Sequence, residues 1–471
     1  MSRRSSEAGP GVRRVRTRRG PAGVASPRRP RPLGGARAVE SPSEVDVIGQ
    51  TPNRLQTRKP RPFDLGVSAR WLEAHVRPVI HRGPLSPRES ALADRIKQLK
   101  KEAGSHSPSA PTILKMIPEL RMRVDACFLS NPYATELFLD NLYREIIRPG
   151  KLRKLLEFYP SQNRVIAGKL ANVLGLPPER LFIGNGAIEI IQAILHRFTG
   201  DKILVNLPTF SPYHEFVRPD TEVVYNTLRK EDDFRFDAGA YLQTVRREKP
   251  DTVVLINPNN PDGGYIPYAK LVGMLEEMRD VPNVLVDESF IHFACEGDGY
   301  AYRSLTGELD RFPNLMVVKS MSKDFGVAGI RAGYAVMAPD RVKALLENGY
   351  LWNSSGLAEY FFDLYSRPEF QVDYERKRVH YIRHSRRFFK ALTNLPGVHA
   401  YPTHANFALL EIRRDDLTAE DLVCRLLVRR GIYARACDDK KGLEPGRFLR
   451  VASRTRSENR YILRGLKEAL R

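Results

Sequence analysis

The sequence predicts an open α/β fold whose mainly parallel sheet carries a ligand site at the carboxyl ends of its strands. Four apolar runs between residues 203 and 318 lead into polar segments of different chemical character. Helical periodicity recurs around these runs, which is typical of strand–helix units in a sheet covered on both faces. Ligand sites of such sheets lie beyond the carboxyl ends of the strands. We therefore expect an acid, an amide, an amine and a guanidinium to meet in one crevice.

The expected elements follow one another in a regular order. Helical periodicity covers residues 135–158, 162–174 and 187–198, strand-like runs lie at 203–205, 253–256, 284–286 and 315–318, helical periodicity returns over 340–394, and a last strand-like run spans 407–412. This order predicts a large domain and a smaller α+β domain. The expected boundaries are a basic tail at 1–62, a helical extension and linker at 63–110, the first part of the smaller domain at 111–160, the large domain at 161–350, and the rest of the smaller domain at 351–471.

The first 62 residues differ in composition from the rest of the chain. They hold fifteen Lys and Arg against four acidic residues, so +11 of the net charge of +21 lies there, together with nine prolines. Such a segment buries too little apolar surface to offset the entropy of ordering, and we predict that it is disordered. A targeting segment or a nucleic-acid-binding arm stays open for it.

A helix is expected just before the globular part. Ser86-Pro87-Arg88-Glu89 matches a capping box and precedes apolar residues at helical spacing, including Ile96. We expect this helix to pack against the globular body, followed by the linker Gly-Ser-His-Ser-Pro-Ser.

The polar residues after the strands suit one cofactor, pyridoxal 5′-phosphate (PLP). Lys323 can form a Schiff base with the cofactor aldehyde, and Asp287 can keep the pyridine nitrogen protonated. Asn260 can donate a hydrogen bond to the phenolic oxygen, and Tyr213 can stack on the ring. Cationic, hydroxyl and backbone N–H donors for the cofactor phosphate are expected from Gly186, Ala187, Ser320, Ser322 and Arg331.

Three motifs carry a family resemblance. They are Asn-Pro-Asn-Asn-Pro-Asp-Gly at 257–263, Val-Asp-Glu-Ser-Phe-Ile-His-Phe at 286–293, and Ser-Met-Ser-Lys-Asp-Phe-Gly-Val-Ala-Gly-Ile-Arg-Ala-Gly-Tyr at 320–334. Over residues 120–471 the chain resembles the fold type I PLP enzymes, most nearly the aminotransferase class I/II group around histidinol-phosphate aminotransferase and threonine-phosphate decarboxylase. The resemblance implies a seven-stranded sheet and the cofactor roles given above. It also implies a homodimer with shared active sites, since Tyr159 falls on a Tyr-Pro motif that reaches the neighbouring subunit's cofactor phosphate.

Further residues bear on the reaction. Phe290 stands where family aminotransferases usually carry a tyrosine that donates to the cofactor. Arg435 and Arg450 fall on the two anion-binding arginines of threonine-phosphate decarboxylase, and Asn131 resembles an Asn-Pro contact to the substrate. Two arginine forks suit a substrate with a carboxylate and a phosphate.

The resemblance thus implies decarboxylation of O-phospho-L-threonine, or of phosphoserine, to the amino-alcohol phosphate. Transamination of the histidinol-phosphate type stays open. A DNA-binding regulator with a ligand-sensing domain is a remote alternative, and nucleic acid is not an expected partner.

The composition argues against a membrane-spanning protein and against one stabilised by metal ions or disulfides. No apolar run approaches the roughly 18 residues of a transmembrane helix, so we expect no membrane partner. The four cysteines at positions 127, 295, 424 and 437 show neither metal-ligand spacing nor a disulfide framework. We expect no metal site and a reducing, cytoplasmic location.

Overall fold

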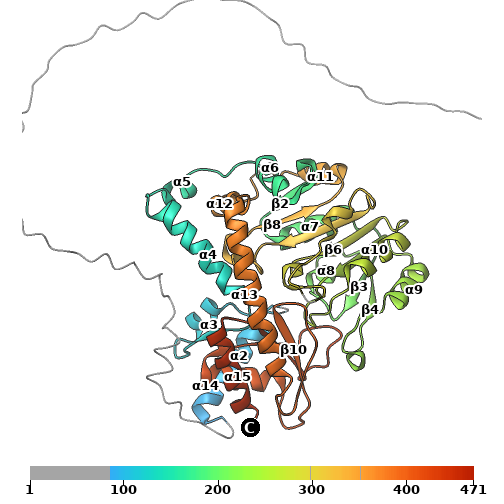
Figure 1. Cartoon of the computed structure of the whole chain (residues 1–471). Coiled ribbons are helices and arrows are strands. Elements are labelled where there is room, and N and C mark those ends of the chain that lie inside the picture. The colour runs from blue at the N-terminus through green and yellow to red at the C-terminus, as the bar shows by residue number, and fades with distance from the viewer. Residues whose placement is uncertain (1–84, 105, 298, 351) are drawn as a thin grey trace, which may run out of the picture. The chain divides into compact units, whose positions relative to one another are not determined.

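A computed structural model describes residues 85–104, 106–297, 299–350 and 352–471 (Figure 1). The predicted tail at 1–62 and the beginning of the predicted extension, residues 63–84, lie outside the described residues. The described chain contains a seven-stranded sheet, a four-stranded sheet and a pair of short strands, with helices packed around them.

The seven-stranded sheet is mainly parallel, as the sequence predicts. Strand β8 runs antiparallel to both of its neighbours, and the other four pairings are parallel. In spatial order the strands are β2 (Leu181–Gly184), β8 (Gly333–Val336), β7 (Leu315–Ser320), β6 (Asn283–Asp287), β5 (Thr252–Ile256), β3 (Lys202–Leu207) and β4 (Glu222–Thr227). Strands β5, β6 and β7 lie side by side, so their carboxyl ends bring the Asn260, Asp287 and Lys323 segments together.

Both faces of this sheet are buried. Along β6, Val284 and Val286 belong to one apolar core, whereas Leu285 belongs to another on the opposite face. This alternation follows from the two-residue period of a strand. Helices α6, α9, α10 and α12 contribute to the first core, and α7 and α11 to the second; their bounds are α6 (Asn163–Leu174), α7 (Ala187–Phe198), α9 (Ala238–Glu248), α10 (Tyr268–Glu277), α11 (Pro339–Leu346) and α12 (Gly356–Tyr365).

The four-stranded sheet is antiparallel and belongs to the C-terminal part of the chain. Its spatial order is β12 (Arg435–Ala436), β13 (Phe448–Ala452), β10 (Phe407–Ile412) and β9 (Val398–Ala400). Its core includes Leu410, Leu449 and Val451 and residues of the helices α14 and α15. The remaining elements are α3 (Ala110–Met116), β1 (Val124–Asp125), α4 (Pro132–Leu142), α5 (Leu152–Glu157), α8 (Pro212–Glu215), α13 (Pro368–Leu392), α14 (Ala419–Arg430), β11 (Ile432–Tyr433) and α15 (Arg456–Ala469).

The expected N-terminal helix is confirmed as α2 (Pro87–Glu102). Ser86 and Glu89 form a reciprocal capping box at its start. Its buried Ala93 and Ile96 pack in an apolar cluster that includes Leu427 of α14. Figure 1 shows α2 beside α14, and the extension therefore packs on the globular body, as expected.

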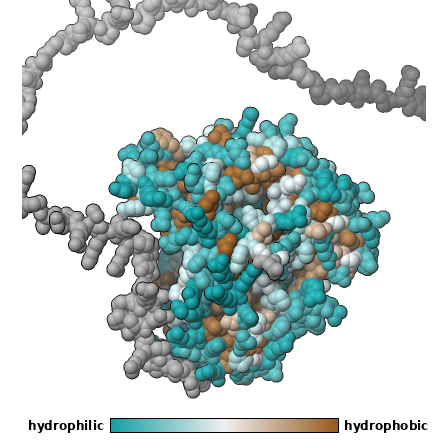
Figure 2. All heavy atoms as spheres, viewed as in Figure 1, coloured by the Kyte–Doolittle hydropathy of each residue, from teal (hydrophilic) through white to brown (hydrophobic). Residues whose placement is uncertain are grey.

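The outer surface of the described residues is mainly polar on the side shown in Figure 2, with smaller apolar groups between hydrophilic ones. Within the described ranges, no helix combines the length and the apolar character that crossing a bilayer requires.

Candidate active site

A cavity of about 270 Å³ lies at the carboxyl ends of β5, β6 and β7 and extends to the four-stranded sheet. Nine of the thirteen site residues predicted from the sequence line it: Ala187, Asn260, Asp287, Ser320, Ser322, Lys323, Arg331, Arg435 and Arg450. The strand order produces this convergence, because residues far apart in the chain follow neighbouring strands. The four predicted residues that do not line the cavity are Asn131, Tyr159, Gly186 and Tyr213.

Asp287 ends β6 and is buried at the cavity wall. Its Oδ2 accepts a hydrogen bond from the Tyr213 hydroxyl at 2.9 Å, and its Oδ1 accepts one from the Ser289 N–H at 2.8 Å. Burial raises the pKa of Asp287 above its ordinary value, and these hydrogen bonds oppose the rise. A carboxylate held in this way is oriented to pair with a cationic group inside the cavity.

The expectation for Tyr213 needs a correction. Tyr213 is fully buried beside Asp287 and does not line the cavity, so its ring is not placed for stacking on a ligand there. Phe210, three residues earlier, lines the cavity instead, with its ring 6.4 Å from that of Tyr213. The turn after β3 directs the first aromatic residue of the Thr-Phe-Ser-Pro-Tyr segment inward and buries the second.

Lys323 follows β7 in a loop whose backbone carbonyls accept hydrogen bonds from Asn131. Burial, followed by the positive charges of Arg450 and Arg331, lowers the pKa of Lys323 to about 8. A lysine with this pKa has a much larger neutral fraction near pH 7 than an exposed one, and the neutral amine is the nucleophile.

Asn131 anchors the Lys323 loop and does not reach the cavity, which corrects the predicted substrate contact. Its N–H donates to the Lys323 carbonyl at 2.9 Å, and its Nδ2 donates to the Asp324 carbonyl at 3.1 Å. Its Oδ1 caps α4 by accepting from the Tyr133 N–H. The side chain is thus used within the fold to hold the lysine loop against the start of α4.

A cradle for an anionic group forms at the start of α7. Gly186 has φ 83°, and a Cβ there would overlap the Arg331 guanidinium, so only glycine allows this approach. Ala187 opens α7, whose first N–H groups are available to an anion. Ser320 and Ser322 line the same cavity, and the Ser322 N–H donates to the Ser320 Oγ at 3.2 Å. The Lys323 amine, the buried Asp287 carboxylate and this cradle together are the groups that binding of PLP requires.

Arg435 and Arg450 lie directly opposite each other on β12 and β13, which directs both side chains to the same face of the sheet. Both are buried. The Arg450 guanidinium donates to the Asn260 Oδ1 at 2.7 Å and to the Cys127 carbonyl at 3.0 Å. Within the described part of the chain, the buried Nε of Arg450 has no hydrogen-bond partner. Burial lowers the pKa of Arg450 to about 10, and the charge of Arg435 adds to this effect.

Several lining residues were not predicted. They are His106, Ser107, Phe128, Leu129, Ile188, Ile191, Phe210, Ile256, Ser289, Phe290 and Lys440; Phe290 had been noted only for the missing tyrosine. His106 and Ser107 belong to the linker after α2, a segment for which we expected only packing against the globular body. Lys440 follows Asp438 and Asp439 in a polar loop that looks solvent-exposed in sequence.

Tyr159 is 84% exposed and lies outside the cavity of its own chain. Its ring is 5.5 Å from that of Trp352, which is 53% exposed. The structure therefore gives Tyr159 no role within one chain.

The sheet order, with an aspartate ending β6 and a lysine after β7, defines a fold type I PLP-dependent enzyme. The profile of the family described as aminotransferase class I and II matches residues 141–466, and the chain belongs to this family.

Two relatives and one solved structure show which members of this family the chain resembles. An L-serine phosphate decarboxylase of Campylobacter jejuni is 52% identical, over 81% of this chain and 97% of the relative. A solved decarboxylase of Sulfurospirillum multivorans has a TM-score of 0.78 at 45% identity, over 82% and 97% of the two chains. A histidinol-phosphate aminotransferase of Caldanaerobacter subterraneus is 32% identical, over 64% and 81%.

Proposed function

We propose that this protein is a PLP-dependent decarboxylase that converts O-phospho-L-serine to O-phosphoethanolamine and CO2. The observation that carries the proposal is the pair of buried arginines on facing strands, because they offer two anion sites within the cavity that holds Lys323 and Asp287. A substrate of histidinol-phosphate type carries a phosphate but no carboxylate and would use one of these sites. Similarity to two L-serine phosphate decarboxylases places phosphoserine ahead of phosphothreonine, which the sequence had placed first.

PLP, when bound, supplies an electron-accepting ring for the pair left on Cα as CO2 departs. The cofactor would be held by Lys323 through its aldehyde, by Asp287 at the pyridine nitrogen, and by Arg331 with the start of α7 at the phosphate. Phe210, which lines the cavity, would cover the ring.

Arg450 would fix the substrate carboxylate and so set the direction of the bond that breaks. Lys323, with a pKa of about 8, can carry the proton that Cα receives in place of the carboxylate. This proton balances the reaction, since loss of CO2 leaves one electron pair on carbon. Phe290 lines the cavity with its ring 5.3 Å from that of Phe407 and donates no hydrogen bond to the cofactor from its side chain.

The protein is also proposed to act as a homodimer. Four exposed apolar side chains lie near one another in sequence or in space: Leu156, Phe158 and Tyr159 after and within α5, and Trp352 beside Tyr159. Exposed groups of this kind mark interaction surfaces. Tyr159 would then reach the partner's cofactor phosphate, which light scattering of a Tyr159→Ser variant together with its PLP affinity can test.

Product analysis tests the reaction. The purified holoenzyme is incubated with O-phospho-L-serine, O-phospho-L-threonine and histidinol phosphate, each with and without 2-oxoglutarate. Release of CO2 and O-phosphoethanolamine without 2-oxoglutarate is the expected result. A keto product that requires 2-oxoglutarate would overturn the proposal in favour of transamination. The regulator alternative needs a winged helix ahead of the domain, within residues 63–110; the described end of this segment consists of α2, the linker and the start of α3, and the relatives are enzymes. The cytoplasmic location stays a prediction.

A further inference from the structure

A second cation lies beside Arg435 in the cavity wall. Lys440 is buried in the loop between β12 and β13, and its Nζ donates to the Ser211 Oγ at 3.2 Å. Its Nζ is 3.5 Å from the Asp439 Oδ2, which also accepts from Arg435 at 2.7 Å. One carboxylate thus holds the two cations on the same side of the cavity.

The linker after α2 reaches the same place. The Ser107 Oγ accepts from the Arg435 Nη1 at 2.7 Å, and the Pro108 carbonyl accepts from the Tyr433 hydroxyl at 2.8 Å. Lys100, in the last turn of α2, donates to the other oxygen of Asp439 at 3.0 Å. Ser107 and Pro108 are therefore fixed against β11 and β12, and His106 and Ser107 form part of the cavity wall.

Arg450 occupies a different side of the cavity. Its guanidinium contacts Asn260 from the large sheet and lies 5.2 Å from the Phe407 ring. The two sides therefore differ in their cationic donors, with one guanidinium beside Asn260 and, on the other side, Arg435 and Lys440, which share the carboxylate of Asp439. A carboxylate offers two acceptor oxygens, whereas a phosphate monoester offers three and carries between 1.5 and 2 negative charges near pH 7, so the side with two cationic donors, which Asp439 only partly neutralises, matches the phosphate.

We propose that Arg435 and Lys440, positioned by Ser107 and Asp439, bind the phosphate of the substrate, whereas Arg450 binds its carboxylate. This assignment rests on the proposed function and extends it to the N-terminal linker. Lys440 and Ser107 thereby become determinants of specificity for a phosphorylated side chain. Lys440 contacts the phosphate directly, and Ser107 acts by orienting Arg435.

Two ligands that each carry one of the anions test the assignment. O-Phosphoethanolamine has the phosphate without the carboxylate, and L-serine has the carboxylate without the phosphate. Dissociation constants are measured by calorimetry on the holoenzyme, whose cofactor-phosphate site is already filled. Lys440→Met and Ser107→Ala probe one side and Arg450→Met the other. Lys441→Met is the matched control, because Lys441 is exposed and its Nζ contacts the Tyr225 hydroxyl.

Lys440→Met is expected to weaken O-phosphoethanolamine binding by about 10- to 100-fold, as for loss of a charge-assisted hydrogen bond. Ser107→Ala is expected to weaken it by about 3- to 10-fold, as for loss of one neutral hydrogen bond. Both should leave L-serine binding within about twofold, Arg450→Met should show the reverse pattern, and Lys440→Arg should restore most of the phosphate affinity.

Unchanged O-phosphoethanolamine binding in Lys440→Met, or equal weakening of both ligands, would overturn the assignment. Ser107→Ala gives an independent answer if Lys440→Met fails to fold. Decarboxylation of phosphoserine by the wild-type enzyme is measured in parallel. If the selective binding losses occur and the wild type releases no CO2, the phosphate subsite stands and the proposed reaction fails.

Discussion

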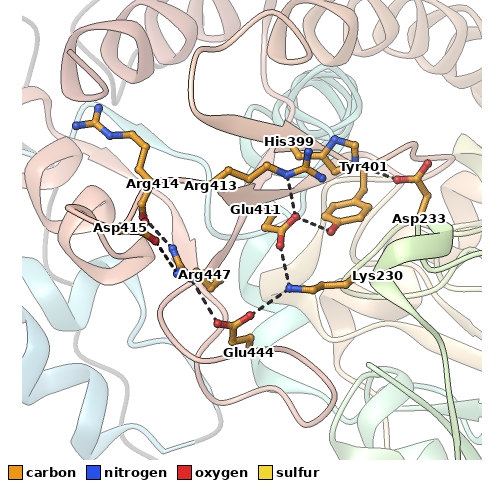
Figure 3. Close-up of polar contacts among 10 residues, drawn as sticks. All are labelled: Lys230, Asp233, His399, Tyr401, Glu411, Arg413, Arg414, Asp415, Glu444 and Arg447. Carbon is orange, nitrogen blue, oxygen red and sulfur yellow. Dashed lines mark hydrogen bonds and ion pairs between the residues drawn. The ribbon is translucent and has the colours of Figure 1, made fainter.

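Two charged regions of this molecule differ in how their charges are balanced. The cavity is lined by five cationic residues and by one carboxylate, that of Asp287; the cations are Lys323, Arg331, Arg435, Lys440 and Arg450. The second region, the Glu411 cluster, lies at β9, β10 and the adjoining loops (Figure 3). It joins three cations and four carboxylates with one histidine: Lys230, Arg413, Arg447, Asp233, Glu411, Asp415, Glu444 and His399. Arg414 takes part through its backbone carbonyl, which accepts from Arg447, and its guanidinium pairs with Asp416.

The pKa values follow the balance of charge. Burial lowers the pKa of Lys440 to about 8 and that of Arg450 to about 10. In the Glu411 cluster, hydrogen bonds to Glu444 and Glu411 raise the pKa of Lys230. A buried cation without a full complement of acids costs stability, whereas a matched pair can hold two segments together. The surplus charge in the cavity therefore indicates where ligand anions belong, and the Glu411 cluster indicates where the fold is held.

Replacing Lys323 by alanine should show the largest difference between the cavity, whose residues determine activity, and the Glu411 cluster, whose residues determine stability. Decarboxylation is expected to fall by about 10⁴-fold, the upper end of what one proton-transferring side chain contributes. Borohydride reduction of the wild type with PLP should attach the cofactor covalently at residue 323, and the variant should attach none there. The urea midpoint of the ligand-free variant should not fall. Retained turnover, or trapping at another lysine, would contradict the assignment.

Arg450 and Arg447 offer a comparison within one chain segment. Arg450→Met is expected to lower kcat/KM for phosphoserine by about 100-fold, because charge-assisted hydrogen bonds to the substrate are lost. Arg447 pairs with Asp415 and Glu444 in the Glu411 cluster. Arg447→Met should therefore keep its kcat/KM and lower only the urea midpoint. A loss of activity in Arg447→Met at unchanged stability would contradict the assignment of Arg447 to stability alone.

The sequence was informative where a polar residue ends a buried strand. Asp287 and Lys323 follow adjacent parallel strands, so local apolar runs were enough to bring them together. The glycine cradle could also be predicted, because Gly186 stands directly before a periodic helix. Side-chain direction within a turn was less accessible. Phe210 and Tyr213 are both aromatic and three residues apart, and only the packing against β6 decides which one faces the cavity.

Residues that reach the cavity from a loop or a linker gave no signal. Lys440 is separated from its strands by a polar stretch, and His106 and Ser107 lie outside the segment that resembles the family. Their positions depend on α2 docking against α14 through contacts such as Glu89 to Arg429, more than 300 residues away in sequence. The Asn-Pro motif singled out Asn131 as a substrate contact, but its hydrogen bonds show that it holds the Lys323 loop against the start of α4.

Lys440 should make the ligand-free protein sensitive to pH. Its folded pKa lies below the ordinary value of 10.5, so the unfolded chain holds more protons between about pH 8 and 10.5. The free energy of unfolding should rise with pH across this window, by about 3 kcal/mol for a shift of this size. Lys323 contributes in the same window, so the test compares Lys440→Met with the wild type by urea unfolding at pH 7.5 and 9.5. Identical slopes would show that Lys440 is solvated.

Glu411 should have the smallest effect, with the opposite dependence on pH. Although burial alone would raise its pKa, hydrogen bonds from Lys230 and Tyr401 lower it below 4.5. The stabilisation is therefore present above about pH 4.5 and is lost as the pH falls through the folded pKa. Glu411→Gln should lower the free energy of unfolding by about 1–2 kcal/mol at pH 7, and the difference from the wild type should shrink in acid.

The exposed Asp415→Asn is the control for Glu411→Gln and should unfold at nearly the wild-type midpoint, because an almost fully exposed ion pair adds little stability. Both variants should keep the wild-type kcat/KM for phosphoserine, since Glu411 and Asp415 do not line the cavity. A fall in kcat/KM for Glu411→Gln at temperatures where it is fully folded would mean that the Glu411 cluster also sets the position of β13. In that case the position of Arg450 on β13 would depend on the balanced charges of the Glu411 cluster as well as on the surplus positive charge of the cavity.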